Sequence, residues 1–190
     1  MSAPAAGGSP RRWATRANAL TALRLAAVPP MVVAVLAGSS AAACALFALA
    51  VATDLLDGRV ARRFGEATPL GGLLDHCADA TFVAAGLGAL ALRGDVPAPL
   101  PVLVAAAFVQ YVLDSRALAG RRLRASGLGR VNGVAYFVLL GIPLLRDALG
   151  LGAPGETIVR WLGWLLVATT LASMAQRWRA RAGDGVKLNN

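Results

Sequence analysis

Long apolar stretches are the feature that most constrains this chain. Six of them follow one another, at 18–38, 41–63, 70–92, 98–119, 131–149 and 157–178. A helix of about 20 residues spans a hydrocarbon core of roughly 30 Å, and each stretch is close to that length. Because 57% of the 190 residues are hydrophobic, the chain is too apolar for an ordinary soluble domain. We therefore predict an all-α polytopic membrane protein with six transmembrane helices in one bundle.

The two ends of the chain differ from this bundle. Residues 1–17 are small, then basic, which predicts a disordered leader and a short interfacial segment over 11–17. A secretory signal is the alternative, but Arg24 and the pair Pro29-Pro30 interrupt its apolar run. The prolines should instead kink a retained first helix. We assign 18–179 to the membrane domain and 180–190 to a cytoplasmic tail.

The net charge of +9 is compatible with nucleic-acid binding or with a membrane surface. The placement of this charge favours the membrane. Basic residues gather at both termini, between the second and third apolar stretches, and between the fourth and fifth. The opposite connections hold little beyond Arg93, Arg146 and Arg160. By the positive-inside tendency, the basic side faces the cytoplasm. We therefore expect no nucleic-acid partner, and a multi-pass protein of the inner cell membrane with its termini and active site toward the cytoplasm.

Four aspartates break the apolar pattern in the second and third stretches. The chain has ten acidic residues in all, and four of them fall within 26 positions: Asp54, Asp57, Asp75 and Asp79. A carboxylate at membrane depth costs at least about 3 kcal/mol, so four together need a compensating charge. Divalent cations fit this need, because Mg²⁺ and Mn²⁺ prefer carboxylate oxygens. The sequence thus predicts a site for two cations.

Helical periodicity places these aspartates on two faces. The first pair shares a stripe with Gly58 and Ala61, and the second pair follows Gly71 at four-residue steps. Two antiparallel helices joined by a turn can bring the faces together. The glycines leave room for a ligand, and Arg62 offers a planar donor fork for phosphate. We therefore expect a pocket for metal-bound pyrophosphate and a displacement reaction at phosphorus.

The complete pattern resembles the signature of the CDP-alcohol phosphotransferase (CDP-alcohol phosphatidyltransferase) family. It reads Asp54-x2-Asp57-Gly58-x2-Ala61-Arg62-x8-Gly71-x3-Asp75-x3-Asp79. Members of this family move a phosphate-bearing group from a CDP-linked donor to an alcohol and release CMP. The resemblance implies a membrane enzyme of phospholipid biosynthesis that transfers a phosphatidyl group from CDP-diacylglycerol. It also implies a homodimer.

Residue roles follow from the resemblance. The four aspartates would hold two Mg²⁺ or Mn²⁺ ions, and Asp79 would also accept the proton of the attacking hydroxyl. The donor would contact residues of the motif, of the following turn and of the mouth of the first helix: Gly58, Ala61, Arg62, Thr68, Gly71, Asn18 and Thr21.

Structural interpretations of the same residues stay open. The aspartates can pair with arginines, Thr68 can cap a helix, and Gly58 and Gly71 can serve helix packing. His76 is expected to be a supporting or interface residue. Three tryptophans near the ends of the last stretch are expected at the membrane interfaces: Trp161, Trp164 and Trp178.

The acceptor alcohol is open at this stage. His76 and Ala80 stand where phosphatidylglycerophosphate synthases typically carry Pro and Lys, which counts against glycerol 3-phosphate. Arg116 and Arg130 are the predicted contacts of a phosphorylated acceptor. Within the family, the alternative is a CDP-aminoalcohol donor acting on a lipid alcohol. From another class, the alternative is a cation transporter that uses the aspartates, although the Gly-Ala-Arg spacing has no role there.

Overall fold

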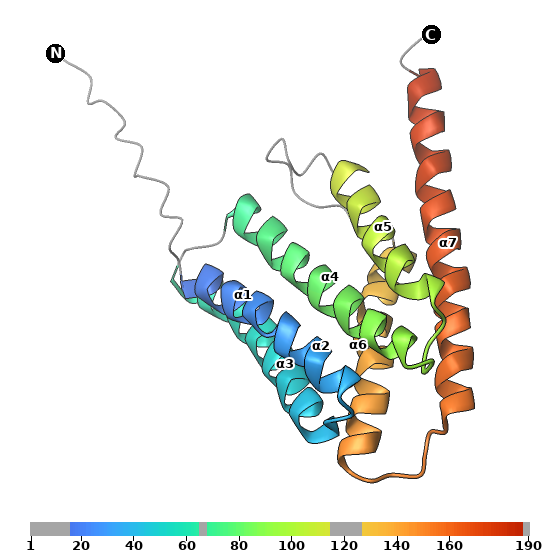
Figure 1. The fold of residues 1–190 in the computed structure, drawn as a ribbon. Coiled ribbons are helices and arrows are strands. Elements are labelled where there is room, and N and C mark those ends of the chain that lie inside the picture. The colour runs from blue at the N-terminus through green and yellow to red at the C-terminus, as the bar shows by residue number, and fades with distance from the viewer. Residues whose placement is uncertain (1–15, 65–67, 115–126, 188–190) are drawn as a thin grey trace, which may run out of the picture.

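The computed structural model describes residues 16–64, 68–114 and 127–187, and the regular structure of that part is entirely helical (Figure 1). Its helices are α1 Arg16–Ala26, α2 Val28–Leu36, α3 Ser40–Arg63, α4 Pro69–Leu92, α5 Pro99–Asp114, α6 Gly127–Ala148 and α7 Glu156–Lys187. Since α1 and α2 together form one membrane segment, these helices make six segments. The predicted all-α membrane bundle is confirmed.

Five segments are long and apolar enough to cross a membrane, and these are Asn18–Leu36, Ser40–Val60, Gly71–Leu92, Gly127–Ala148 and Glu156–Ala180. Helix α5 is apolar but has only 16 residues in the described part. Most predicted bounds agree within a few residues. The leader and nearly all of the interfacial segment predicted over 11–17 lie outside the described residues.

Two helices extend beyond their predicted apolar stretches. Helix α6 begins at Gly127, so Arg130 lies in a helix and not in the connection between the predicted stretches 98–119 and 131–149. Helix α7 continues to Lys187, well past residue 178. Apolar composition marks the part of a helix that matches hydrocarbon, whereas a helix can continue into the polar interface with basic residues. Hydropathy therefore predicted the start of α6 too late in the chain and the end of α7 too early.

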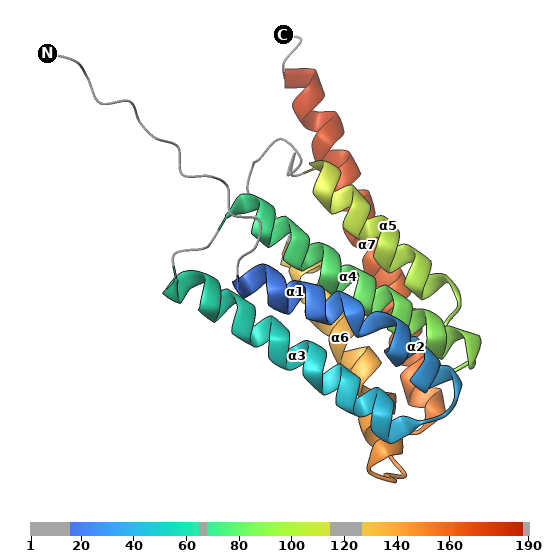
Figure 2. The same cartoon turned by 60° about the vertical axis from the view of Figure 1, so that its left-hand side comes forward.

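The first membrane segment is interrupted, as the prolines predicted. Helix α1 ends at Ala26, and α2 starts at Val28 with Pro29 and Pro30 in its first turn. Proline has no N–H group, so the junction lacks two of the hydrogen bonds that a continuous helix would form. The backbone N–H of Ala27 still donates to the carbonyl of Leu23 at 3.0 Å. The segment therefore continues in the same general direction across a weakened junction (Figure 2).

Helix α1 lies between α3 and α4 (Figure 2). It packs against both of them, whereas α3 and α4 make little contact with each other. Further along, α2 packs on α3 and α4, and the core there contains the fully buried side chains of Met31 and Leu140. Gly86 allows this close packing, because a Cβ at that position would lie 2.8 Å from both side chains. The helices that carry the acidic motif are thus held apart by the first segment.

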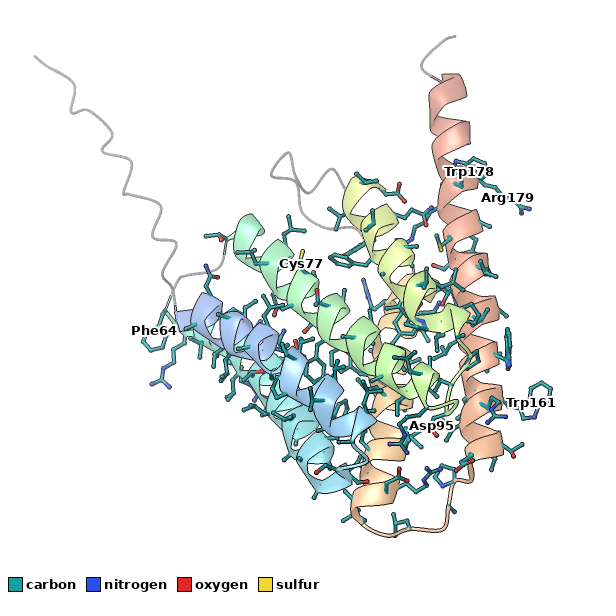
Figure 3. All side chains as sticks on the ribbon, in the orientation of Figure 1. Phe64, Cys77, Asp95, Trp161, Trp178 and Arg179 are labelled. Carbon is teal, nitrogen blue, oxygen red and sulfur yellow. The ribbon has the colours of Figure 1, made fainter. Side chains whose placement is uncertain are left out.

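The bundle has two distinct ends. The α2–α3, α4–α5 and α6–α7 connections gather at one end, and the start of α1 and the end of α7 point to the other (Figures 1 and 2). Trp161 and Trp178 project outward from α7 with exposed fractions of 71% and 75% (Figure 3). Their separation along the helix is about 25 Å, close to a hydrocarbon thickness. The placement suits aromatic anchors at both interfaces.

Candidate functional site: an acidic cluster around a buried arginine

The four aspartates of the motif converge. Oxygens of Asp54 and Asp57 on α3 and of Asp75 on α4 lie within 4.8 Å of one another. Ligand atoms of Asp75, His76 and Asp79 form a second group within the same limit. Asp75 belongs to both groups. The predicted meeting of the two acid-bearing faces is therefore confirmed as geometry.

Arg24 of α1 lies at the centre of this cluster, and its side chain has an exposed fraction of 0%. Its Nη2 donates to Asp57 Oδ2 at 2.6 Å, and its Nη1 donates to Asp75 Oδ1 at 2.7 Å. The same Nη1 donates to Asp79, and Asp54 lies 3.7 Å from Nη2. One guanidinium thus contacts all four carboxylates. We call Arg24 and these four residues the acidic cluster.

This arrangement corrects the expected two-helix pocket in one respect. The site is built from three helices, and Arg24, which the sequence suggested only as an interruption of an apolar run, lies at its centre. The sequence did contain a signal for Arg24, because an ionisable residue inside a membrane helix suggests a functional site by default. Periodicity within one helix cannot show which neighbour a side chain will face, and the partner acids lie about 30 to 55 residues further along the chain.

The composition of the acidic cluster fits divalent cations. One guanidinium cannot neutralise four carboxylates, and the described residues provide no second arginine or lysine in a salt bridge with them. The available ligand atoms are oxygens, which suit Mg²⁺ and Mn²⁺. Asp75 can serve both groups, as expected for a residue between two ions. The excess of negative charge is the observation that favours the predicted cation site.

Three of the predicted donor contacts meet at the start of α4. The Thr68 hydroxyl accepts a hydrogen bond from the Gly71 N–H at 3.0 Å and caps the helix, so the structural interpretation of Thr68 holds. A Cβ at Gly71 would lie 3.1 Å from Thr68 Oγ1 and 3.6 Å from Asn18 Oδ1. Asn18 therefore comes from α1 to the same place. Thr21, one turn before Arg24, is buried.

The remaining donor residues lie near the end of α3. A Cβ at Gly58 would lie 3.4 Å from the Arg62 Nη1, so the Arg62 side chain folds back along its helix over the glycine. Arg62 is exposed and is therefore accessible to a ligand. Ala61 belongs to the same helix. The predicted acceptor contact Arg116 lies outside the described residues.

A cavity of about 560 Å³ adjoins the acidic cluster, among α4, α5, α6 and α7. Asp54 and Asp79 line it at the cluster, and Arg130 and Arg177 line it as well. The Arg177 guanidinium lies 5.3 Å from the centre of the Tyr111 ring, a cation–π contact. The predicted acceptor residue Arg130 and the acidic motif thus share one cavity.

The same cavity contains polar groups that are not satisfied within the described part of the chain. Arg177 Nε and Nη1 and Ser173 Oγ are buried there and have no hydrogen-bond partner. Buried polar groups in proteins are nearly always hydrogen-bonded, so such donors point to a ligand or to water. From the sequence, Arg177 was predicted only as one of the basic residues that gather at the C-terminal end. Thr170, Ser173 and Arg177 recur at helical spacing, and this polar stripe was the signal available.

Comparison with known proteins agrees with this geometry. The family model described as CDP-alcohol phosphatidyltransferase matches residues 14–172. A probable phosphatidylglycerophosphate synthase of Mycobacterium tuberculosis is 42% identical over 99 residues, which cover 49% of this chain and 47% of the relative. A CDP-diacylglycerol–glycerol-3-phosphate 3-phosphatidyltransferase of Pseudomonas fluorescens is 41% identical over 73 residues, 37% of each chain. The matched region spans about half or less of the length of these relatives.

Proposed function

Because this chain belongs to the CDP-alcohol phosphatidyltransferase family, we propose that it transfers a phosphatidyl group from CDP-diacylglycerol to a phosphate-bearing alcohol, with release of CMP. The observation that carries the proposal is the shared cavity, with Asp54 and Asp79 at the cluster and Arg130 and Arg177 on other helices. The arginines suit the phosphate of an acceptor whose hydroxyl points to Asp79. Glycerol 3-phosphate is the first acceptor to test, because the names of the relatives refer to it or to its product.

The donor would bind over the acidic cluster. The four aspartates would hold two Mg²⁺ or Mn²⁺ ions, which when bound neutralise the pyrophosphate and stabilise the leaving CMP. Arg62 is accessible at the end of α3 to contact a phosphate. Asn18, Thr68 and Gly71 lie together at the N-terminus of α4, where the helix dipole favours an anion. These groups orient the donor so that its reactive phosphorus lies toward the cavity.

We assign the role of general base to Asp79. In the reaction, the acceptor oxygen forms a bond to the phosphorus that carries diacylglycerol, and the bond from that phosphorus to the oxygen of CMP breaks. The hydroxyl proton passes to a carboxylate. Of the cluster aspartates, Asp54 and Asp79 line the cavity, and the Asp79 side chain is the more sheltered, at 19% exposure against 40%. A sheltered carboxylate beside the acceptor suits this task.

The proposal includes the orientation and the assembly of the protein. The acidic cluster lies toward the end of the bundle where α3 carries Arg59 and Arg63 and where α7 carries Arg179. This charge supports a cytoplasmic location for the site by the positive-inside tendency. The homodimer implied by the family resemblance stays a prediction.

A panel of acceptors tests the function. The full chain, reconstituted in bilayers, is given CDP-diacylglycerol, Mn²⁺ and either glycerol 3-phosphate, inositol phosphate, glycerol or serine. CMP release is measured and the lipid product is identified by mass. We expect product only with the phosphate-bearing alcohols. Product with serine or glycerol alone would overturn the acceptor assignment, and cation uptake into the vesicles without CMP release would favour the transporter.

A further inference from the structure

We propose that Arg24 is a built-in cation that holds the four carboxylates together before divalent cations bind, and that it leaves the centre of the cluster when they bind. Arg24 would thus be a positioning residue that competes with the metal for the same oxygens. This inference rests on the cation-binding part of the proposed function, and it is independent of the acceptor and of the transfer step.

The contacts of Arg24 explain why the two kinds of cation would exclude each other. Its Nη atoms lie 2.6 Å and 2.7 Å from oxygens of Asp57 and Asp75, and those oxygens belong to the group that could hold a metal ion. A metal ion that binds these oxygens would lie beside a fully buried guanidinium. Like charges at such a distance repel strongly, because little water is present to screen them.

The position of α1 explains why the cluster needs an internal cation when no metal is bound. Helices α3 and α4 have little direct contact, and α1 packs between them. Four carboxylates on these two helices repel one another, and the repulsion would drive the helices apart. Arg24 reaches Asp57 on α3 and Asp75 on α4 from the helix between them. It therefore ties the two motif helices to α1 by charge.

The junction after α1 provides a way for Arg24 to withdraw. The break at Ala27 follows Arg24 by less than one helical turn, and Pro29 and Pro30 remove two backbone hydrogen bonds from it. Apart from its bonds to the carboxylates, the guanidinium makes a long hydrogen bond from Nε to Thr53 Oγ1, at 3.5 Å. A small rotation of α1 at this junction, together with a change of side-chain rotamer, would free the oxygens.

The test compares Mn²⁺ affinity with stability in the absence of metal. In Arg24→Gln the internal charge is lost, so we expect the Kd for Mn²⁺ to fall about tenfold or more. The same variant without metal should melt about 5 °C or more below the wild type. Mn²⁺ should then raise the Tm of the variant more than that of the wild type. An unchanged or weaker Mn²⁺ affinity in Arg24→Gln would overturn the proposal, since a purely structural arginine predicts only the loss of stability.

Two further variants make the comparison specific. Arg24→Lys keeps the positive charge that repels a bound cation, so its Kd for Mn²⁺ should stay within about threefold of the wild type. Arg93→Gln is the matched control, because Arg93 pairs with Asp95 and Asp147 at the opposite end of the bundle. Its Kd should equal that of the wild type. A tighter Kd in Arg93→Gln, equal to that of Arg24→Gln, would show a general effect of net charge and contradict the proposal.

A measurement on the wild type covers the case in which Arg24→Gln does not fold. An arginine-selective dicarbonyl reagent is applied with and without Mn²⁺, and peptide mapping locates the modified residues. We expect Arg24 to be protected without metal and to react in its presence. Equal protection in both conditions would overturn the proposal. These readouts use no lipid substrate, so a failed transfer assay with the expected Mn²⁺ results would reject the proposed reaction and leave this inference standing.

Discussion

Two groups of charged residues lie at opposite ends of the bundle and differ in their balance of charge. The acidic cluster sets one arginine against four aspartates. At the other end, Arg93 and Arg146 face Asp95 and Asp147, so two positive charges meet two negative ones. We call these four residues the balanced cluster. The first group is left with negative charge to be neutralised, whereas in the second group each aspartate has an arginine to pair with.

The balanced cluster joins the connections at its end. Arg146 pairs with Asp147 at 2.7 Å and donates to the carbonyl of Pro154 at 3.2 Å. Arg93 pairs with Asp95 at 3.1 Å and donates to the carbonyl of Val35 at the end of α2. Each arginine therefore binds both an acid and a backbone carbonyl. Figure 3 shows Asp95 close to the end of α4. The balanced cluster therefore connects the ends of several helices to one another.

The contrast shows that buried charge by itself does not identify a functional site in a membrane protein. Both clusters contain carboxylates and arginines in contact. An excess of one sign, next to a cavity with unsatisfied donors, distinguishes the acidic cluster. Variants in the two regions test this distinction, from the largest expected effect to the smallest.

The largest expected effect comes from the proposed base. Asp79→Asn preserves the shape of the side chain but removes its ability to accept a proton, so transfer should fall by about 10²- to 10⁴-fold. The measurement is CMP release at saturating Mn²⁺. Asp147→Asn in the balanced cluster serves as control and should retain turnover within about twofold. Near-normal turnover in Asp79→Asn would refute the assignment of the base.

The next effect concerns the acceptor. Arg177→Gln removes a charge-assisted contact to the acceptor phosphate, so the KM for the acceptor should rise about 10- to 100-fold while kcat changes little. Steady-state kinetics with the acceptor identified by the panel measure this change. Arg160→Gln is the control on the same helix, because Arg160 donates to the carbonyl of Gly94 at the balanced end. An equal rise in both variants would reject a specific acceptor site at Arg177.

A packing change at the balanced end should alter stability without altering chemistry. A Cβ at Gly163 of α7 would clash with the rigid ring of Pro97. Gly163→Ala should therefore cost about 1–3 kcal/mol, seen as a lower Tm, with the KM values unchanged in the folded fraction. Gly88→Ala, where a Cβ would make only an ordinary contact of 4.0 Å with Pro101, is the matched control. A raised acceptor KM in Gly163→Ala would mean that the two ends are coupled.

The smallest effect is a pH dependence at Asp95. Burial raises the pKa of Asp95, Arg93 opposes this shift, and Glu156 and Asp147 add to it. A carboxyl with a raised pKa favours the folded state in its protonated form, so this contribution is present at low pH and is lost as the pH rises through the folded pKa. The Tm of Asp95→Asn minus that of the wild type should therefore grow by about 1–2 °C between about pH 4 and pH 7. A difference that shrinks over this range would contradict the sign.

Much of the fold followed from the sequence, because apolar length and proline position determine where membrane helices lie and break. The predicted stretch 70–92 and the helix Pro69–Leu92 nearly coincide. Spacing within one helix likewise placed Asp54 with Asp57 and Asp75 with Asp79. Arg24 and Arg177 were missed because their places in the acidic cluster and in the cavity depend on contacts between helices far apart in sequence. The spacing of residues along one helix does not indicate which other helix packs against it.

The number of Mn²⁺ ions bound by each cluster tests the central claim most directly. Mn²⁺ binding to the full chain in bilayers is measured for the wild type, for the double variant Asp57→Asn and Asp75→Asn, and for the double variant Asp95→Asn and Asp147→Asn. We predict about two ions per chain in the wild type and in the balanced-cluster variant, and loss of tight binding in the acidic-cluster variant. Unchanged Mn²⁺ binding in the acidic-cluster variant would contradict the account.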